Sequence, residues 1–151
     1  MSSPELLREA LRELLYGPEG LRGLYSEAGA GLLATVHAYT YAQAAQPPAP
    51  GRPTPAQLTL QLQQALELGA ARLADPHALL SDPRDPEQWR PEHEGDWRAE
   101  LVALARAGEA FYGALYLPLD AGGWREAQGT LLQAVTLAGA LRFHLLNLRA
   151  G

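Results

Sequence analysis

The feature that most constrains the fold is an apolar helical stretch near the C-terminus, residues 130–149, with the sequence TLLQAVTLAGALRFHLLNLR. Its ionisable side chains are limited to Arg142, His144 and Arg149. A helix with so little charge has no polar stripe to turn toward water, so it needs cover from other helices or from a second subunit. Gly139 and the alanines near it leave room for such a neighbour to approach closely.

Prolines divide the remaining chain into segments with the spacing of amphipathic helices. These segments run from Ser2 to Leu15, from about Leu21 to Ala45, from Thr54 to about Asp75, from Trp97 to about Leu117, and from the turn at 120–123 to Arg149. Residues 76–95 lack a sustained period and are expected to form a long surface loop. The sequence therefore predicts an all-α protein, a bundle of four main helices in a single domain over residues 1–151, with an additional or kinked N-terminal helical segment.

The composition excludes several classes of function. The net charge is −5 and the 12 cationic residues are scattered arginines, so no basic surface for nucleic acid is expected. The lack of cysteine and lysine excludes a disulfide, a thiolate site, a Schiff-base lysine and a P-loop lysine. Without a secretory signal or about 18 uninterrupted apolar residues, we expect no membrane span and a cytoplasmic location. The richness in Ala, Leu, Gly, Pro and Arg is typical of a GC-rich bacterial genome.

Two stretches resemble the DinB/YfiT-like family. The segment from Pro50 to Leu58, PGRPTPAQL, is similar to the proline-rich entry into that family's second helix, and Leu131-Leu132 followed by Arg142 is similar to its last helix. The resemblance implies an up-and-down four-helix bundle (DinB/YfiT-like) that is often dimeric. For many members the resemblance also implies a divalent metal bound by three histidines, one on the second helix and two on the last. For some members it implies the transfer of low-molecular-weight thiols.

The positions that match the family's metal ligands are Gln61, Leu137 and Leu141. Leucine has no donor atom, and glutamine is a weak oxygen ligand. The resemblance therefore implies a DinB-like bundle that has lost its metal triad, has no cofactor, and serves as a non-catalytic binding or interaction protein. We expect it to form a homodimer through its least charged helix faces.

Enzymatic activity stays open through displaced metal ligands. His144 follows Leu141 by three residues and shares its helix face, and His37 has apolar neighbours at helical spacing. A site built from His37, Gln61 and His144, with Glu27 or Glu67 nearby, would hold Zn, Ni, Mn or Fe. The chain would then be a metal-dependent thiol transferase or a hydrolase.

A third hypothesis is a bundle that binds a small apolar ligand. The aromatic residues Tyr25, Tyr39, Phe111 and Tyr112 fall on the first and third long helical segments. Pockets between helices are frequent ligand sites in bundles. The same residues also suit an ordinary core with phenol groups at its edge.

Overall fold

The computed structural model describes residues 3–17 and 31–150, and all regular secondary structure within them is helical. The helices are α1 (Ser3–Tyr16), α2 (Leu32–His37), α3 (Tyr41–Ala44), α4 (Pro55–Ala74), α5 (Glu94–Ala114) and α6 (Ala121–Ala150). The predicted all-α class is thus confirmed. The expected helix start at Ser2 and the first part of the predicted 21–45 helix lie outside the described residues.

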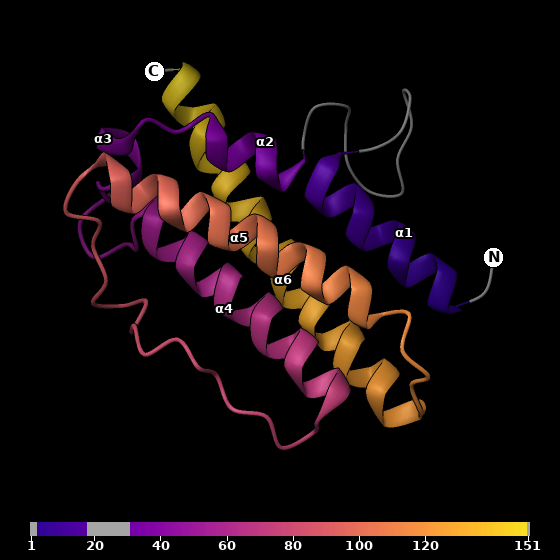
Figure 1. The fold of residues 1–151 in the computed structure, drawn as a ribbon. Helices are drawn as coiled ribbons and strands as arrows, with labels where there is room; N and C mark the ends of the chain where they lie inside the picture. The colour runs from indigo at the N-terminus through magenta and orange to yellow at the C-terminus, as the bar shows by residue number, and fades with distance from the viewer. Residues whose placement is uncertain (1–2, 18–30, 151) are drawn as a thin grey trace.

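Three long helices form the main body (Figure 1). Helix α4 packs against both α5 and α6, and α1 and α2 follow one another across the opposite side, where each contacts α5 and α6. The enclosed core consists largely of leucine and aromatic side chains, among them Leu11, Leu15, Leu66, Leu104, Phe111 and Leu141. Burial of this apolar surface is the main force that holds the helices together.

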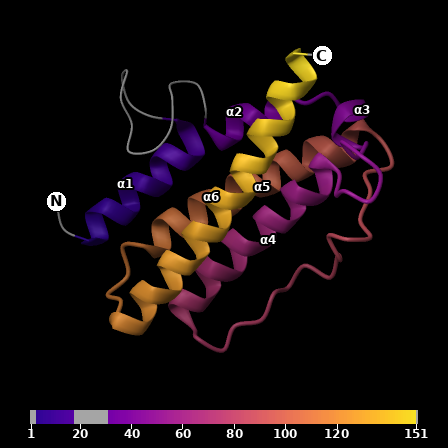
Figure 2. The same ribbon diagram turned by 180° about the vertical axis from the view of Figure 1, so that it is seen from behind.

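The connection between α4 and α5, residues 75–93, runs back along the whole length of the two helices (Figures 1 and 2). Helices α4 and α5 therefore point in the same direction, with α6 antiparallel to both. The strictly alternating up-and-down order that we expected is wrong for this pair. A short turn forces neighbouring helices to be antiparallel, whereas a connection of this length allows the chain to return to its starting end.

Local signals set two helix starts. Helix α4 starts after Thr54, where the sequence predicted it, with Pro55 in the first turn. The structure adds a reciprocal capping box between Thr54 and Gln57. A second capping box, between Thr40 and Gln43, starts α3. It interrupts the helix predicted over 21–45 and leaves Tyr39 in the connection between α2 and α3.

Helix α6 is only partly covered by the rest of the chain. Its buried side chains form one stripe, Ala127, Leu131, Ala134, Ala138, Leu141 and Leu145. The opposite side is open and includes Leu132 and Phe143, each 68% exposed. Of the helices in the described ranges, α6 alone has the length and apolar composition of a membrane span. The described residues 3–17 and 31–150 therefore cover only one side of α6.

Candidate functional site

An open, mostly apolar groove of about 360 Å³ lies between the proline-rich segment before α4 and the C-terminal half of α6. We call it the Tyr39–His144 groove. Its wall includes Pro48, Pro53, Leu58, Phe143, His144 and Asn147, with Tyr39 and Arg52. Its size is near the lower end of the range for small-molecule sites.

The wall on the proline side is shaped by a tight turn. The Arg52 amide donates a hydrogen bond to the Ala49 carbonyl over 3.1 Å, and Gly51 has a φ of 80°. Pro50 and Gly51 thus occupy the central positions that a type II turn requires, since glycine alone adopts that φ without strain. The turn places Arg52 on the rim of the groove.

Tyr39 and His144 lie together at the inner side of the groove. The Tyr39 hydroxyl donates a hydrogen bond of 2.5 Å to the Leu141 carbonyl, and the Tyr39 and His144 rings are stacked with centroids 6.0 Å apart. Burial raises the pKa of Tyr39 to about 12, so the phenol stays a neutral donor near neutral pH. The bond fixes the α2–α3 connection onto α6.

The polar groups of the groove are few, and each can donate a hydrogen bond. Arg52 supplies a permanent cation, His144 an imidazole and Asn147 an amide, and no acidic residue is among the lining side chains. Such a surface offers apolar contact to the body of a ligand and hydrogen-bond donors to an anionic end.

The residues considered as metal ligands are dispersed. Gln61 and His37 are exposed, Leu137 and His144 are half-buried, and Leu141 is fully buried. His37 borders a different hollow, beside α5. Within 3–17 and 31–150, no three His, Cys, Asp or Glu side chains are grouped as a metal ion requires. Of the two additional candidates, Glu27 lies outside the described residues and Glu67 accepts a hydrogen bond from Gln63.

The aromatic candidates are also separated. Tyr39 lines the groove, whereas Phe111 is fully buried in the core. Tyr112 is half-buried and its hydroxyl lies 3.0 Å from that of Tyr116. Tyr25 lies outside the described residues. Of the three candidates that the structure describes, only Tyr39 therefore contributes to the groove.

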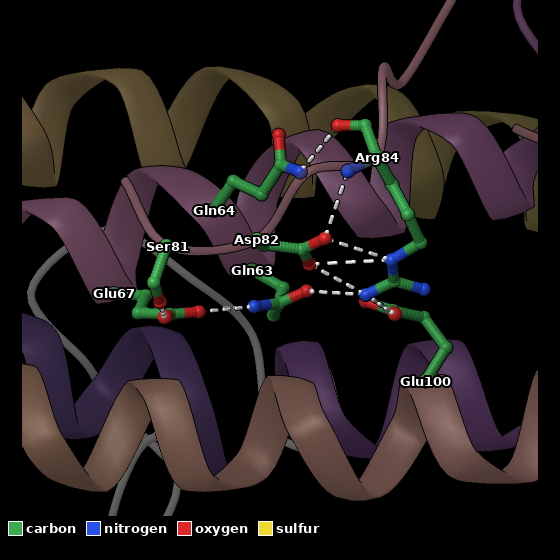
Figure 3. Close-up of polar contacts among 7 residues, drawn as sticks. All are labelled: Gln63, Gln64, Glu67, Ser81, Asp82, Arg84 and Glu100. Carbon is green, nitrogen blue, oxygen red and sulfur yellow. Dashed lines mark hydrogen bonds and ion pairs between the residues drawn. The ribbon is translucent and has the colours of Figure 1, made fainter. Parts of the chain in front are cut away.

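A polar cluster that the sequence did not indicate holds the long loop against α4 and α5 (Figure 3). Arg84 is its centre: its guanidinium lies 2.7 Å from Asp82 and 3.0 Å from Glu100, and it donates to Gln63 over 3.2 Å. Its carbonyl accepts a hydrogen bond from Gln64. We call this group the Arg84 cluster; it comprises Gln63, Gln64, Glu67, Ser81, Asp82, Arg84 and Glu100.

Glu100 is the unusual member of the Arg84 cluster. Its side chain is fully buried, and neither carboxylate oxygen has a well-aligned hydrogen-bond donor among the described residues. Burial raises the pKa of Glu100 to about 7, although the charge of Arg84 opposes the shift. The Asp82 carboxylate, by contrast, has a lowered pKa because Arg84 donates hydrogen bonds to it. The two acids thus share one cation in different environments.

No protein-family model, no curated protein and no solved structure matches the chain.

Proposed function

We propose that the chain is a DinB-like four-helix bundle that lacks the three-histidine metal site and serves as a binding protein for a small, largely apolar molecule with an anionic group. The single observation that carries the ligand proposal is the Tyr39–His144 groove, which joins apolar walls to Arg52 and His144 without an acidic residue.

The number of helical positions around one core supports the DinB-like part of the proposal, whereas the parallel direction of α4 and α5 departs from the up-and-down order that the resemblance implies. Helices α4, α5 and α6, with α1 and α2 together in the fourth position, surround one core. The proline-rich segment PGRPTPAQL leads directly into α4, and it resembles the segment that leads into the family's second helix. The side chains at the family's ligand positions do not fit a metal, because Leu137 and Leu141 have no donor atom and Gln61 is exposed.

A non-catalytic role agrees with the chemistry of the groove. It contains no nucleophile paired with a base, and its one imidazole, that of His144, is stacked on Tyr39. The metal-dependent alternative requires His37 and His144 to converge, but these residues border different hollows. Binding is therefore the function that this geometry supports best. A cytoplasmic location stays a prediction.

Binding of octanoate and 1-octanol tests the proposal, because the two probes share an apolar chain and differ in charge. We expect octanoate to bind more tightly. Arg52→Gln and His144→Gln should each weaken octanoate about fivefold, the size expected for one solvent-exposed charge-assisted contact, and leave 1-octanol nearly unchanged. Arg90→Gln, which replaces an exposed arginine of the long loop, is the matched control. Failure of both probes to bind in the millimolar range, measured by calorimetry, would contradict the proposal.

A further inference from the structure

We propose that the outer face of α6 is the contact surface for a second copy of this chain, with the two α6 helices antiparallel about a two-fold axis between Leu137 and Ala138. The outer face is defined by Gly129, Leu132, Thr136, Gly139, Phe143 and Leu146. The inference depends on α6 alone, and Phe143 is the one residue of this face that also lines the Tyr39–His144 groove.

The outer face is an apolar stripe without cover from the described parts of the chain. Its residues recur at intervals of three and four, on the side of α6 opposite the buried stripe. Leu132 and Phe143 are each 68% exposed, and Leu146 is 46% exposed. A contiguous exposed stripe of this kind marks an interaction surface more often than isolated apolar residues do.

Two glycines on this face have no packing partner among the residues that the structure describes. A Cβ atom at Gly129 or Gly139 would meet nothing within 4 Å, yet each glycine costs a helix interior about 1 kcal/mol relative to alanine. Gly69 and Gly108, in contrast, lie directly against Thr130 and Leu15. Gly113 of α5 is equally open, but it lies one residue from the end of its helix. Gly129 and Gly139 lie inside α6, and close approach of a second helix backbone accounts for these two.

The order of residues along the face suits a copy of itself. Leu132 and Phe143 lie equally far from the point between Leu137 and Ala138, and so do Thr136 and Gly139. In an antiparallel pair, Leu132 of each chain therefore meets Phe143 of the other, with the small residues at the centre. Such a self-complementary patch is what a two-fold interface requires.

Charge also favours a second copy. The exposed side chains of α6 from Gln128 to Leu148 are uncharged, and the one permanent charge in this stretch, Arg142, is half-buried and lies outside the stripe. Two chains of net charge −5 can therefore meet along the stripe without carboxylates opposing one another. A lipid surface fits less well, because the exposed Gln128, Gln133 and Asn147 would lose their water partners in hydrocarbon.

The contact is of limited size. The stretch from Gly129 to Leu146 is about 27 Å long, so a single helix pair gives an interface at the small end of the dimer range. We therefore expect a dimer that forms in the micromolar range and dissociates on dilution.

Sedimentation equilibrium across that range tests the dimer. We expect the unaltered chain to dimerise with a dissociation constant of about 10 μM, and Leu132→Arg, which lies outside the groove, to raise that constant at least tenfold. Val102→Arg is the matched control, since Val102 is 51% exposed on α5, and it should leave the dimer intact. A monomer at all concentrations would overturn the proposal. This holds whether the outer face of α6 is then covered by residues 18–30, by lipid or by nothing.

Cysteine pairing tests the direction of the helices, because the chain has no cysteine of its own. Mixing Leu132→Cys with Phe143→Cys protein under mild oxidation should give a mixed disulfide dimer in preference to either homodimer. Val102→Cys should give only background cross-linking. A Leu132→Cys homodimer that forms as readily as the mixed product would indicate parallel helices and overturn the two-fold arrangement.

Discussion

The guanidinium of Arg84 lies 3.0 Å from the carboxylate of Glu100, whose side chain is fully buried. This contact joins the long loop to α5. A buried carboxylate is costly unless a partner compensates its charge. Arg84 is that partner, but it also pairs with Asp82. The loop is thus held by one guanidinium that pairs with two carboxylates. The carboxylate of Glu100 is strongly desolvated and that of Asp82 is not.

The first prediction concerns the pH dependence of stability. The pKa of Glu100 rises from its ordinary 4.5 to about 7 on folding, so between these values the folded chain keeps a proton that the unfolded chain has lost. Stability due to this group is therefore present at low pH and lost as pH rises toward 7, by about 2–3 kcal/mol. Asp82 acts in the opposite sense, but only below its ordinary pKa of 3.8.

Glu100→Gln should remove this pH dependence, because the amide does not titrate. Urea unfolding at about pH 5 and about pH 8 should show that the variant gains stability relative to the unaltered chain at the higher pH. Glu109→Gln, an exposed carboxylate on the same helix, is the control. Identical pH profiles for the Glu100 variant and the unaltered chain would refute the assignment.

A second prediction concerns Arg84. Arg84→Met keeps the aliphatic stem but leaves Glu100 without its cation, so we expect a loss of about 2–4 kcal/mol at about pH 8. The loss should be smaller at about pH 5, where Glu100 is neutral. Limited proteolysis should also cut the 75–93 loop faster. Addition of Glu100→Gln should recover part of the stability, whereas Arg90→Met should have little effect. A loss equal at both pH values would point to packing instead of charge.

The sequence predicted the parts of the fold that depend on local chemistry. Thr54-Pro55 identified the start of α4, because an N-cap threonine and a proline in the first turn are signals from neighbouring residues. The break at Tyr39 had a similar signal, the Thr40-Gln43 capping box, which the apolar periodicity of 21–45 concealed. The direction of α5 relative to α4 had no local signal, since a loop of that length returns to either end of the bundle.

The sequence indicated individual residues of the candidate site but not that they lie together. Tyr39 and His144 were singled out separately, but their stacking depends on how α6 crosses the α2–α3 connection. Glu100 was missed, although it lies three residues after Trp97 and four before Leu104, on the same apolar face of α5. An acid on such a face indicates a buried ion pair, but only the fold identifies Arg84 as the partner.

A third prediction tests the bond between Tyr39 and α6. Tyr39→Phe keeps the ring and removes the hydroxyl that donates to the Leu141 carbonyl. Because that carbonyl lies within α6, the loss should be limited to about 1 kcal/mol. Thermal unfolding measures it, and Tyr41→Phe, whose hydroxyl donates to Pro91 over 3.2 Å, provides a partly buried comparison. A loss several times larger would mean that the hydroxyl holds more of the α2–α3 connection than this single bond.

The last prediction separates stability of the chain from association of two chains. Gly139→Ala adds a methyl group where nothing lies within 4 Å, whereas Gly69→Ala places one 2.6 Å from the Thr130 side chain. In dilute, monomeric protein we therefore expect Gly139→Ala to stabilise the fold by up to about 1 kcal/mol, since alanine is the better helix former. Gly69→Ala should destabilise it through the clash.

At concentrations where the chain associates, the two variants should behave in the opposite order. Gly139→Ala should weaken the dimer, because the added methyl group separates the two helix backbones, and Gly69→Ala should leave the dissociation constant unchanged once its folded fraction is taken into account. Thermal unfolding of dilute samples and sedimentation of concentrated ones give the two readouts. If Gly139→Ala stabilised the fold without changing association, the glycine would have no role in a helix–helix contact, and the outer face of α6 would lose its strongest argument for a second copy.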